Sequence, residues 1–456
     1  MAHRTAPRPD HDERRFIDLK ETSIPTQLID NRTPMDRAVL MGAPTREIEP
    51  RLAHEHLLEL ARLTDTAGGR VVATLQQRID MPHARLYIGE GKAHELRDLV
   101  SEREADLVIF DEELTPAQGR NLEQILGVRV MDRPELILDI FATRARSREA
   151  RMQVELAQLQ YLRPRLKRMW SHLSRTRGGI GLRGPGETQL ETDRRLVGIR
   201  IADLRRKLRD VAAAREVQRS RRAAEFRVAL VGYTNAGKSS LLHALSGADL
   251  FIEDRLFATL DSTTRSVDLD AGYTALMTDT VGFIRKLPHH LVASFRSTLE
   301  EAREADILLH VQDASHPDRA EHEEVVDQVL HDLGLDDRPR ILVYNKMDLL
   351  DAADATALRD ELHRKDEASA PALFVSAHEP ETLASLRVTL AARARALLHR
   401  IHIRVPAAAG DVLAEIHRDG EMLEQSHNGS MIEVIARVPA ATAGRLTGRA
   451  DIVRVE

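Results

Sequence analysis

Apolar and polar residues alternate in blocks along most of the chain, and the blocks have the lengths of strands and helices. Between residues 37 and 142, short apolar runs are followed by stretches with apolar residues at helical spacing. After an apolar run at Ala38–Met41, the expected strands are Val71–Leu75, Leu107–Phe110 and Val128–Met131, and the expected helices are Leu52–Leu63, Lys92–Leu99, Pro116–Leu126 and Pro134–Phe141. This alternation predicts a parallel sheet, so we interpret 37–142 as an N-terminal α/β domain behind a loose polar tail, 1–36.

A seven-residue apolar repeat replaces this pattern between residues 143 and 222. The repeated positions are Met152, Leu159, Leu166 and Leu173 in the first half and Leu190, Val197, Leu204 and Val211 in the second. Two such helices joined by a short loop predict an antiparallel helical hairpin, in which Pro164 should kink the first helix. The loop at 178–186 holds five glycines in nine residues, so little orders its backbone.

Strands and helices alternate again over 223–399, which predicts a second α/β domain. The expected strands are Arg227–Val231, Ala275–Thr278, Ile307–Gln312, Arg340–Tyr344 and Ala372–Val375, and the expected helices are Ser239–Ser246, Leu291–Ala305, Ala320–Leu333, Ala355–Arg364 and Leu383–Leu398. The last segment, 400–456, shows a strand, a helix and two strands around Asn428-Gly429, a strong hairpin signal. We interpret it as a small C-terminal α/β domain.

Composition excludes several classes of protein. The chain has no cysteine, which excludes disulfides, thiolate nucleophiles and cysteine-type zinc sites and favours a reducing cytosol. Its polar start lacks the features of a signal peptide, and no apolar run is long enough to span a membrane. We therefore expect a soluble cytoplasmic protein, with a monomer as the default state.

The charge is distributed unevenly. The net charge of −6 argues against nucleic-acid binding, but residues 144–222 carry 22 Lys and Arg against 8 Asp and Glu. This +14 segment suits insertion along a phosphate backbone, and the arginines nearest the loop are Arg177, Arg183, Arg194 and Arg195. The alternative is that these charges form the solvated face of a coiled coil, although such faces usually carry balanced charges.

The segment from Gly232 to Ser239 matches the phosphate-loop motif G-x-x-x-x-G-K-S and lies between an apolar strand and a helix. In such a loop the backbone N–H groups turn toward phosphate, Lys238 supplies a charge to the β- and γ-phosphates, and Ser239 offers a hydroxyl to Mg²⁺. The context of strand and helix makes a chance glycine turn a poor explanation.

Three further motifs follow in the order that a GTP site requires. Asp279 to Gly282 can hold Mg²⁺ through water and place an N–H at the γ-phosphate. Asp348, in the Asn345–Asp348 motif, can accept from N1–H and the 2-amino group of guanine, a pair that adenine lacks. Ser376 and the two residues after it fit the loop that covers the base.

Between the first two motifs lies a segment that we interpret as the first switch loop, Phe257–Asp261. Thr259 can complete the Mg²⁺ shell when the γ-phosphate is present, and Thr263 or Thr264 is the competing choice. The expected nucleotide contacts are Gly232, Tyr233, Thr234, Asn235, Ala236, Gly237, Lys238, Ser239, Ser240, Phe257, Ala258, Thr259, Leu260, Asp261, Asp279, Thr280, Val281, Gly282, Asn345, Lys346, Met347, Asp348, Ser376, Ala377 and His378. The expected Mg²⁺ ligands are Ser239, Thr259 and Asp279, and Lys238, Thr259 and Gly282 are the expected catalytic groups.

Phe283 stands where Ras-like switches carry the glutamine that orients the attacking water. Phenylalanine cannot do this, so we expect slow intrinsic hydrolysis that a partner or another group in the chain accelerates. The side chain of Asn235 could help to bind a monovalent cation near the phosphates. The alternative is that its amide only stabilises the phosphate loop. No side chain qualifies as a general base, so catalysis should depend on positioning and electrostatics.

These motifs, together with the run from Gly178 to Arg195, Ile88–Lys92 and Asp111–Pro116, resemble HflX-type GTPases over about residues 37 to 400. The resemblance implies a ribosome-associated GTPase that binds the large subunit and its rRNA and splits stalled or idle ribosomes under stress. A hydrophobic residue at the position of Phe283 is usual in this family. Two departures are small: Ser262 stands where proline is common, and His378 where many members have leucine.

Several alternatives stay open at this stage. A GTPase in ribosome assembly or tRNA modification would prefer precursor particles or tRNA, and a switch for an acidic protein would be indifferent to ribonuclease. Asp348 disfavours ATP-driven RNA remodelling but does not exclude it for the N-terminal domain. Gly89–Lys92 could be a second phosphate loop, but it lacks the spacing of that motif, so a plain turn between a strand and a helix is favoured. His289-His290 could bind a metal, but two surface histidines before a helix are the favoured interpretation.

Overall fold

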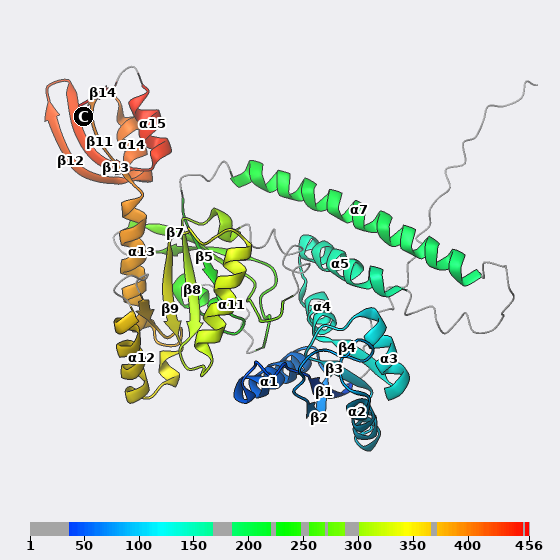
Figure 1. Ribbon diagram of the computed structural model, residues 1–456. Coiled ribbons are helices and arrows are strands. Elements are labelled where there is room, and N and C mark those ends of the chain that lie inside the picture. The colour runs from blue at the N-terminus through cyan, green and yellow to red at the C-terminus, as the bar shows by residue number, and fades with distance from the viewer. Residues whose placement is uncertain are drawn as a thin grey trace, which may run out of the picture. The chain divides into compact units, whose positions relative to one another are not determined.

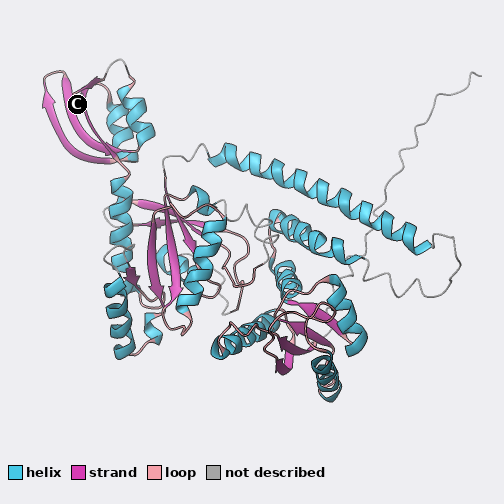
Figure 2. Cartoon of the chain, in the orientation of Figure 1, coloured by secondary structure: helices cyan, strands magenta, loops and turns pink. Residues whose placement is uncertain are grey.

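The described part of the chain forms three β-sheets with the helices that pack on them, and a pair of long helices (Figures 1 and 2). The structure is a computed structural model that describes residues 36–166, 185–219, 225–247, 255–269, 272–287, 301–365, 372–449 and 452–455. Four predicted features lie wholly or partly outside these ranges: residues 1–35 of the polar tail, residues 178–184 of the loop, residues 291–300 of the helix expected at 291–305, and His289-His290.

The N-terminal domain contains a fully parallel sheet of four strands in the order β2-β1-β3-β4. Its elements are β1 (Arg37–Gly42), α1 (Pro50–Thr66), β2 (Arg70–Gln76), α2 (Glu90–Glu102), β3 (Leu107–Phe110), α3 (Pro116–Leu126), β4 (Arg129–Asp132) and α4 (Arg133–Arg144). Helices α1 and α4 cover one face, and α2 and α3 cover the other. The parallel pairing of all four strands confirms the predicted parallel sheet. The apolar runs of β1 and β3 are buried on both faces, as is usual in such sheets, whereas the edge strand β2 is partly exposed.

Local signals explain where helix α3 begins and ends. Thr115 and Gln118 form a reciprocal capping box at its start, and Pro116 occupies its first turn. Gly127 ends the helix with a positive φ of 74°, a conformation that costs glycine little.

Asp139 of α4 makes the stability of the protein depend on pH. Burial raises the pKa of Asp139 to about 7; Arg129 opposes this shift and Glu135 adds to it. Because the folded protein holds the Asp139 proton more tightly than the unfolded chain does, protonation stabilises the fold. This contribution is fully present below the pKa of the unfolded chain, about 3.9, and is lost as pH rises through the folded pKa of about 7. Relative to an Asp139→Asn variant, the wild type should lose about 2–4 kcal/mol of unfolding free energy between about pH 5 and pH 8, measured by urea titration. Parallel pH profiles of the two proteins would contradict this assignment.

The helical pair consists of α5 (Arg148–Leu162), continued by the short 3-10 helix η2 (Arg163–Arg165), and α7 (Pro185–Arg219). Leu156 and Leu166 pack against Val197, Ile201 and Leu204, as the seven-residue repeat predicts. Pro164 was predicted to kink the helix; the regular α-helix instead ends at Leu162, because a proline at 164 cannot continue the backbone hydrogen bonds. The described structure resumes at residue 185, so the last two residues of the predicted loop lie at the start of α7.

The second α/β domain is built on a six-stranded sheet in the order β10-β9-β8-β5-β7-β6. Its elements are β5 (Phe226–Val231), α8 (Lys238–Ser246), β6 (Thr263–Asp268), β7 (Thr274–Asp279), β8 (Ile307–Asp313), α11 (Arg319–Asp332), β9 (Arg340–Asn345), η6 (Met347–Leu349), α12 (Ala352–Lys365), β10 (Ala372–Phe374), η7 (Pro380–Leu383) and α13 (Ala384–Ala396). Helices α8 and α13 cover one face of the sheet and α11 covers the other. All neighbouring strands are parallel except β6, an edge strand that the sequence analysis did not predict.

The C-terminal domain has an antiparallel sheet in the order β12-β13-β11-β14. Its elements are β11 (His399–Pro406), α14 (Gly410–Asp419), β12 (Glu421–Asn428), β13 (Met431–Val438), α15 (Ala440–Thr447) and β14 (Val453–Arg454). Gly429 takes a φ of 65° in the turn between β12 and β13, as the Asn-Gly signal predicts. Helix α15 and strand β14 were not predicted. In the part of the chain that the structure describes, no helix is long and apolar enough to cross a membrane.

Candidate functional site

The phosphate loop joins β5 to α8 and wraps closely against the neighbouring strands. A Cβ atom on Gly232 would lie 2.2 Å from the carbonyl oxygen of Val311, and one on Gly237 would lie 2.2 Å from Nδ2 of Asn345. Gly232 and Gly237 also have positive φ angles of 150° and 90°. Only glycine fits at these two positions, so the loop can turn its N–H groups inward at the start of α8.

Lys238 is the first residue of α8, and its side chain is buried. Its ammonium group donates to the carbonyl oxygens of Gly232 and Tyr233 at 3.1 and 2.9 Å. Burial lowers the pKa of Lys238 to about 8, although nearby Asp279 acts to raise it. The charge therefore lies inside the loop that would surround the phosphates.

Three oxygen-bearing side chains gather beside Lys238, as expected for a Mg²⁺ site. The Ser239 hydroxyl lies 2.7 Å from Oγ1 of Thr259 and donates to Oδ2 of Asp279 at 2.5 Å. The other carboxylate oxygen of Asp279 is buried without a hydrogen-bond partner, and burial raises the pKa of this group although Lys238 lowers it. Hydroxyl and carboxylate oxygens with one buried oxygen unsatisfied fit a hard cation.

The competing threonines of the first switch loop lie elsewhere. Thr264 contacts Thr278 across strands β6 and β7, with 2.8 Å between the hydroxyl oxygens, and Thr263 begins β6. The structure thus brings Thr259, and neither competitor, to Ser239.

The segment around Phe283, which follows β7 and which we call the second switch loop, is hydrogen-bonded directly to the phosphate loop. The N–H of Thr234 donates to the carbonyl of Phe283 at 2.7 Å, and the N–H of Phe283 donates to the carbonyl of Gly232 at 3.0 Å. A Cβ on Gly282 would lie 2.6 Å from Cα of Thr234, which explains the glycine there. The side chain of Phe283 is 1% exposed, so it packs in the core and offers nothing to a water molecule.

The residues expected around the base are held by three sets of polar contacts. Asn345 donates to the carbonyl of Ala236 at 3.0 Å and accepts from the N–H of Ala377 at 3.1 Å. Ser376 donates to Oδ1 of Asp348 at 2.6 Å, which holds the carboxylate that should accept from guanine. Lys346 pairs with Asp313 at 2.6 Å, and the N–H of His378 donates to the Ser376 hydroxyl at 3.1 Å.

The first switch loop also contacts the segment that leads into the helical pair. Oδ2 of Asp261 accepts from the backbone N–H groups of Arg146 and Ser147 at 2.9 and 3.1 Å, and Oδ1 accepts from the Ser147 hydroxyl. Ser147 is the N-cap of α5, so a switch carboxylate lies at the start of that helix. Phe257 packs edge-to-face on Phe141 of α4, with 4.7 Å between ring centroids.

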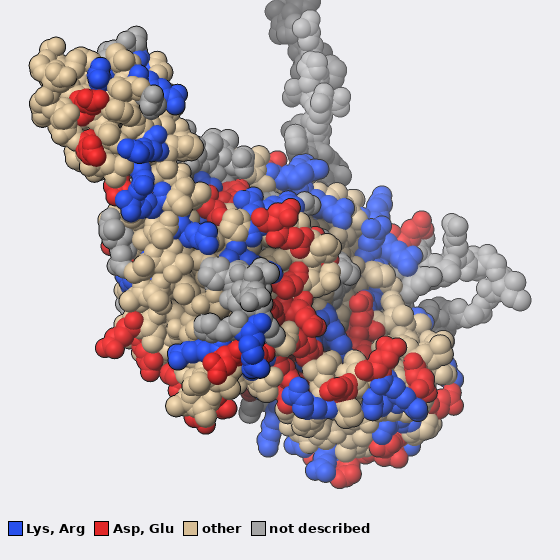
Figure 3. All heavy atoms as spheres, turned by 60° about the vertical axis from the view of Figure 1, so that its left-hand side comes forward, with Lys and Arg blue, Asp and Glu red and all other residues tan. Residues whose placement is uncertain are grey.

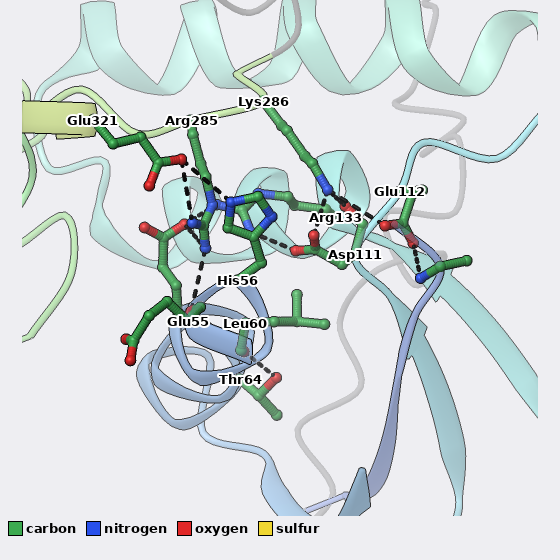
Figure 4. A network of polar contacts seen from close by, with 12 residues as sticks. Glu55, His56, Leu60, Thr64, Asp111, Glu112, Arg133, Arg285, Lys286 and Glu321 are labelled. Atoms are coloured by element: carbon green, nitrogen blue, oxygen red, sulfur yellow. Dashed lines mark hydrogen bonds and ion pairs between the residues drawn. The ribbon is translucent and has the colours of Figure 1, made fainter. Parts of the chain in front are cut away.

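The second switch loop enters a buried charge network with the N-terminal domain (Figure 4). Arg133 is fully buried and pairs with Glu59 and with Asp111, the latter at 2.7 Å. From the switch loop, Arg285 reaches Glu59 at 3.2 Å and Lys286 pairs with Asp111. Burial acts to raise the pKa of both carboxylates, but the neighbouring cations outweigh it and lower the pKa of Glu59 and Asp111.

Tyr233 of the phosphate loop joins the same network. Its hydroxyl donates to Glu59 and accepts from the N–H of Arg285 at 3.1 Å. The sequence analysis expected Tyr233 only at the nucleotide and did not predict the roles of Glu59, Arg133, Arg285 or Lys286. These residues carry no motif, and no signal in the sequence pairs them.

The other candidates fall in different places. Arg194 and Arg195 are exposed on α7, whereas Arg177 and Arg183 lie outside the described residues. Lys92 is paired with Glu95 at 2.9 Å on α2, so its charge is already neutralised. Asn235 has a positive φ of 61° and lines the cavity beside the phosphate loop.

Three protein-family descriptions match successive parts of the chain. "GTP-binding GTPase N-terminal" matches residues 54–142, "GTP-binding GTPase Middle Region" matches 144–222, and "50S ribosome-binding GTPase" matches 227–346. Together they cover most of the N-terminal domain, the helical pair and the second α/β domain as far as residue 346.

Full-length relatives are also similar. The GTPase HflX of Alkalihalophilus pseudofirmus is 44% identical over 405 residues, covering 88% of this chain and 93% of that protein. The GTPase HflX of Escherichia coli is 44% identical over 367 residues, covering 80% and 85%. A crystal structure of the SsGBP and GDP complex is 25% identical, covers 80% of this chain and 99% of that chain, and has a TM-score of 0.45.

Proposed function

Since this chain belongs to the HflX family of GTPases, a ribosome-associated family, we propose that it binds the large ribosomal subunit and splits stalled or idle ribosomes in a GTP-dependent manner under stress. The chain binds and hydrolyses GTP as its family does. The observation that supports the proposal is that both switch loops contact the parts that precede the GTPase domain. The first contacts the start of the helical pair, and the second forms ion pairs with the N-terminal domain.

The site would hydrolyse GTP by positioning and electrostatics. Lys238 and the loop N–H groups would hold the β- and γ-phosphates, and Gly282 would present its N–H to the γ-phosphate. Ser239, Thr259 and Asp279 would hold Mg²⁺, which neutralises phosphate charge when bound. Because Phe283 is buried, no side chain there orders the attacking water, and turnover should be slow without a partner.

Through these switch contacts, a change of nucleotide would move the N-terminal domain and the helical pair. When the γ-phosphate draws Thr259 and Gly282 inward, Asp261 and Arg285 must move with them. Their partners are Ser147, the N-cap of α5, and Glu59 of α1, so the N-terminal domain and the helical pair would change their orientation between the GTP and GDP states.

Helix α7 supplies a basic surface for rRNA. Some of its charges are balanced, because Asp203 pairs with Arg206 and Lys207 at 2.7 and 2.8 Å and Arg200 pairs with Glu155. Four exposed arginines of α7 form no ion pair with any described residue: Arg194, Arg195, Arg205 and Arg209. On the face of the molecule that Figure 3 shows, Lys and Arg are interspersed with Asp and Glu. The four arginines of α7 are therefore the better candidates for phosphate contact. We further propose that the protein acts in the cytoplasm as a monomer.

The test is GTP turnover by the purified protein alone, with large subunits and with intact ribosomes, with light scattering followed in parallel. Strong stimulation with loss of scattering is expected, because the ribosome would order the attacking water. Turnover that ignores ribosomes, with constant scattering, would discard the ribosome as partner and leave tRNA, a precursor particle or an acidic protein.

A Ser147→Ala variant tests the coupling within the same experiment. It removes one switch contact but no nucleotide ligand, so we expect intrinsic turnover to persist and ribosome splitting to slow several-fold. Loss of the helix cap also destabilises α5 by about 1 kcal/mol. Thr115→Ala removes a similar cap from α3 and is the matched control. Equal splitting rates in the two variants would contradict the coupling.

A further inference from the structure

An arginine outside every sequence motif lines the cavity beside the phosphate loop. The cavity has about 430 Å³ of empty space, part of it open to solvent, and its walls come from the phosphate loop, the first switch loop and Gly282. This residue is Arg255, which lies directly before the buried Leu256.

 

Arg255 is the first residue of the described range 255–269, and the chain around it is tied to the phosphate loop. Leu256 and Phe257, which follow it, are 6% and 2% exposed. The N–H of Phe257 donates to the hydroxyl of Thr234 at 2.9 Å. These contacts keep the backbone of Arg255 beside the cavity, so a long side chain there can reach the phosphates.

The charges around the cavity suit a polyanion. Among its described lining residues, the charged side chains are Lys238 and Arg255, and none is acidic. Lys238 is buried and bonded to the loop carbonyls, whereas Arg255 is exposed and has no hydrogen bond or ion pair with a described residue. Its guanidinium group is therefore available to phosphate oxygens, which it can bind through two parallel N–H donors.

We propose that Arg255 is an arginine finger carried in the same chain, a further catalytic residue that contacts the γ-phosphate oxygens of GTP in the transition state. The inference rests on the GTP site described above and not on the ribosome. In the reaction, the oxygen of water bonds to the γ-phosphorus while the bond from that phosphorus to the β–γ bridging oxygen breaks. GDP leaves with the bond's electron pair, and the proton of water passes to phosphate. Arg255 forms no covalent bond and stabilises the negative charge on the transferring group.

This role agrees with the slow turnover that we expect of the isolated protein. An arginine finger stabilises charge but leaves the attacking water to be ordered, and the buried Phe283 cannot order it. A partner that orders the water would then act together with Arg255, so the arginine should matter in both basal and stimulated turnover.

The experiment compares wild type, Arg255→Ala and Arg255→Lys, with Arg265→Ala as the control. Arg265 is an exposed arginine of β6 whose side chain donates to the backbone of Thr264. Arg255→Ala should lower kcat about 10²–10³-fold and abolish tight binding of GDP with aluminium fluoride, a transition-state analogue, because both depend on the developing charge. Affinities for GDP and a non-hydrolysable GTP analogue should change less than about threefold. Lysine should restore only part of kcat, because it lacks the planar pair of donors.

Three outcomes would overturn the proposal. Unchanged kcat and unchanged fluoride binding would show that Arg255 does not contact the reacting phosphate. An equal loss of affinity for all nucleotides would make it an ordinary ground-state contact. Full rescue of Arg255→Ala by potassium chloride would assign the charge to a cation near Asn235. Failure of the wild type itself to bind GDP would instead remove the nucleotide site on which the inference rests.

Discussion

Lys238→Ala should abolish tight nucleotide binding while leaving the protein folded. Hydrogen bonds to charged groups contribute about 1.5–3 kcal/mol each, so the loss of contacts to two phosphates should weaken GTP and GDP binding about 10²–10⁴-fold. Burial lowers the pKa of Lys238 to about 8, which means that the folded protein tolerates this charge poorly without nucleotide. The variant should therefore be no less stable than wild type when both lack nucleotide. Fluorescent-nucleotide titration and thermal unfolding measure the two effects.

Lys92→Ala is the matched control, because Lys92 follows the glycine-rich turn that resembles a second phosphate loop. Its ammonium group already pairs with Glu95, so nucleotide binding should be unchanged. GTP turnover at the wild-type rate by Lys238→Ala would show that the site is assigned wrongly. A loss of GTP binding in Lys92→Ala would move attention to the N-terminal domain.

Arg133→Ala should destabilise the protein by about 3–5 kcal/mol, since it leaves two buried carboxylates without their shared cation. Arg133 is 0% exposed and pairs with both Glu59 and Asp111. Arg285 and Lys286 would remain beside these carboxylates, so the network should loosen around the second switch loop rather than vanish. Urea unfolding of wild type and variant at neutral pH measures the difference.

The loss should diminish in acid, because protonation of the carboxylates removes the unpaired charge. The pKa of Asp111 is lowered in the fold, so its contribution is present above the unfolded value and is lost as pH falls through the folded one. Arg97→Ala, which removes an exposed arginine paired with its neighbour Asp98, should change stability by less than about 0.5 kcal/mol. Equal effects of the two substitutions would mean that the buried network contributes nothing.

The nucleotide site could be predicted from the sequence alone. The phosphate loop, the Asp279–Gly282 segment and Asn345–Asp348 are short runs whose spacing is set by the turns that connect strands to helices, so local pattern suffices. The seven-residue repeat likewise predicted the packing of α5 on α7, because a single periodic face determines which residues meet. The parallel N-terminal sheet followed from its buried apolar runs.

Only the tertiary structure decided which polar groups meet. Thr259 lies at Ser239 while Thr264 lies in β6, and that edge strand escaped prediction because Val267 is its sole apolar residue. Glu59 and Arg285 are 226 positions apart, and Glu59 reads in the sequence as an ordinary charge on a helix. Ion pairs between distant segments depend on three-dimensional proximity and leave no periodic trace in the chain. For the same physical reason, Arg255 acquires its significance only from the cavity that the folded loops enclose.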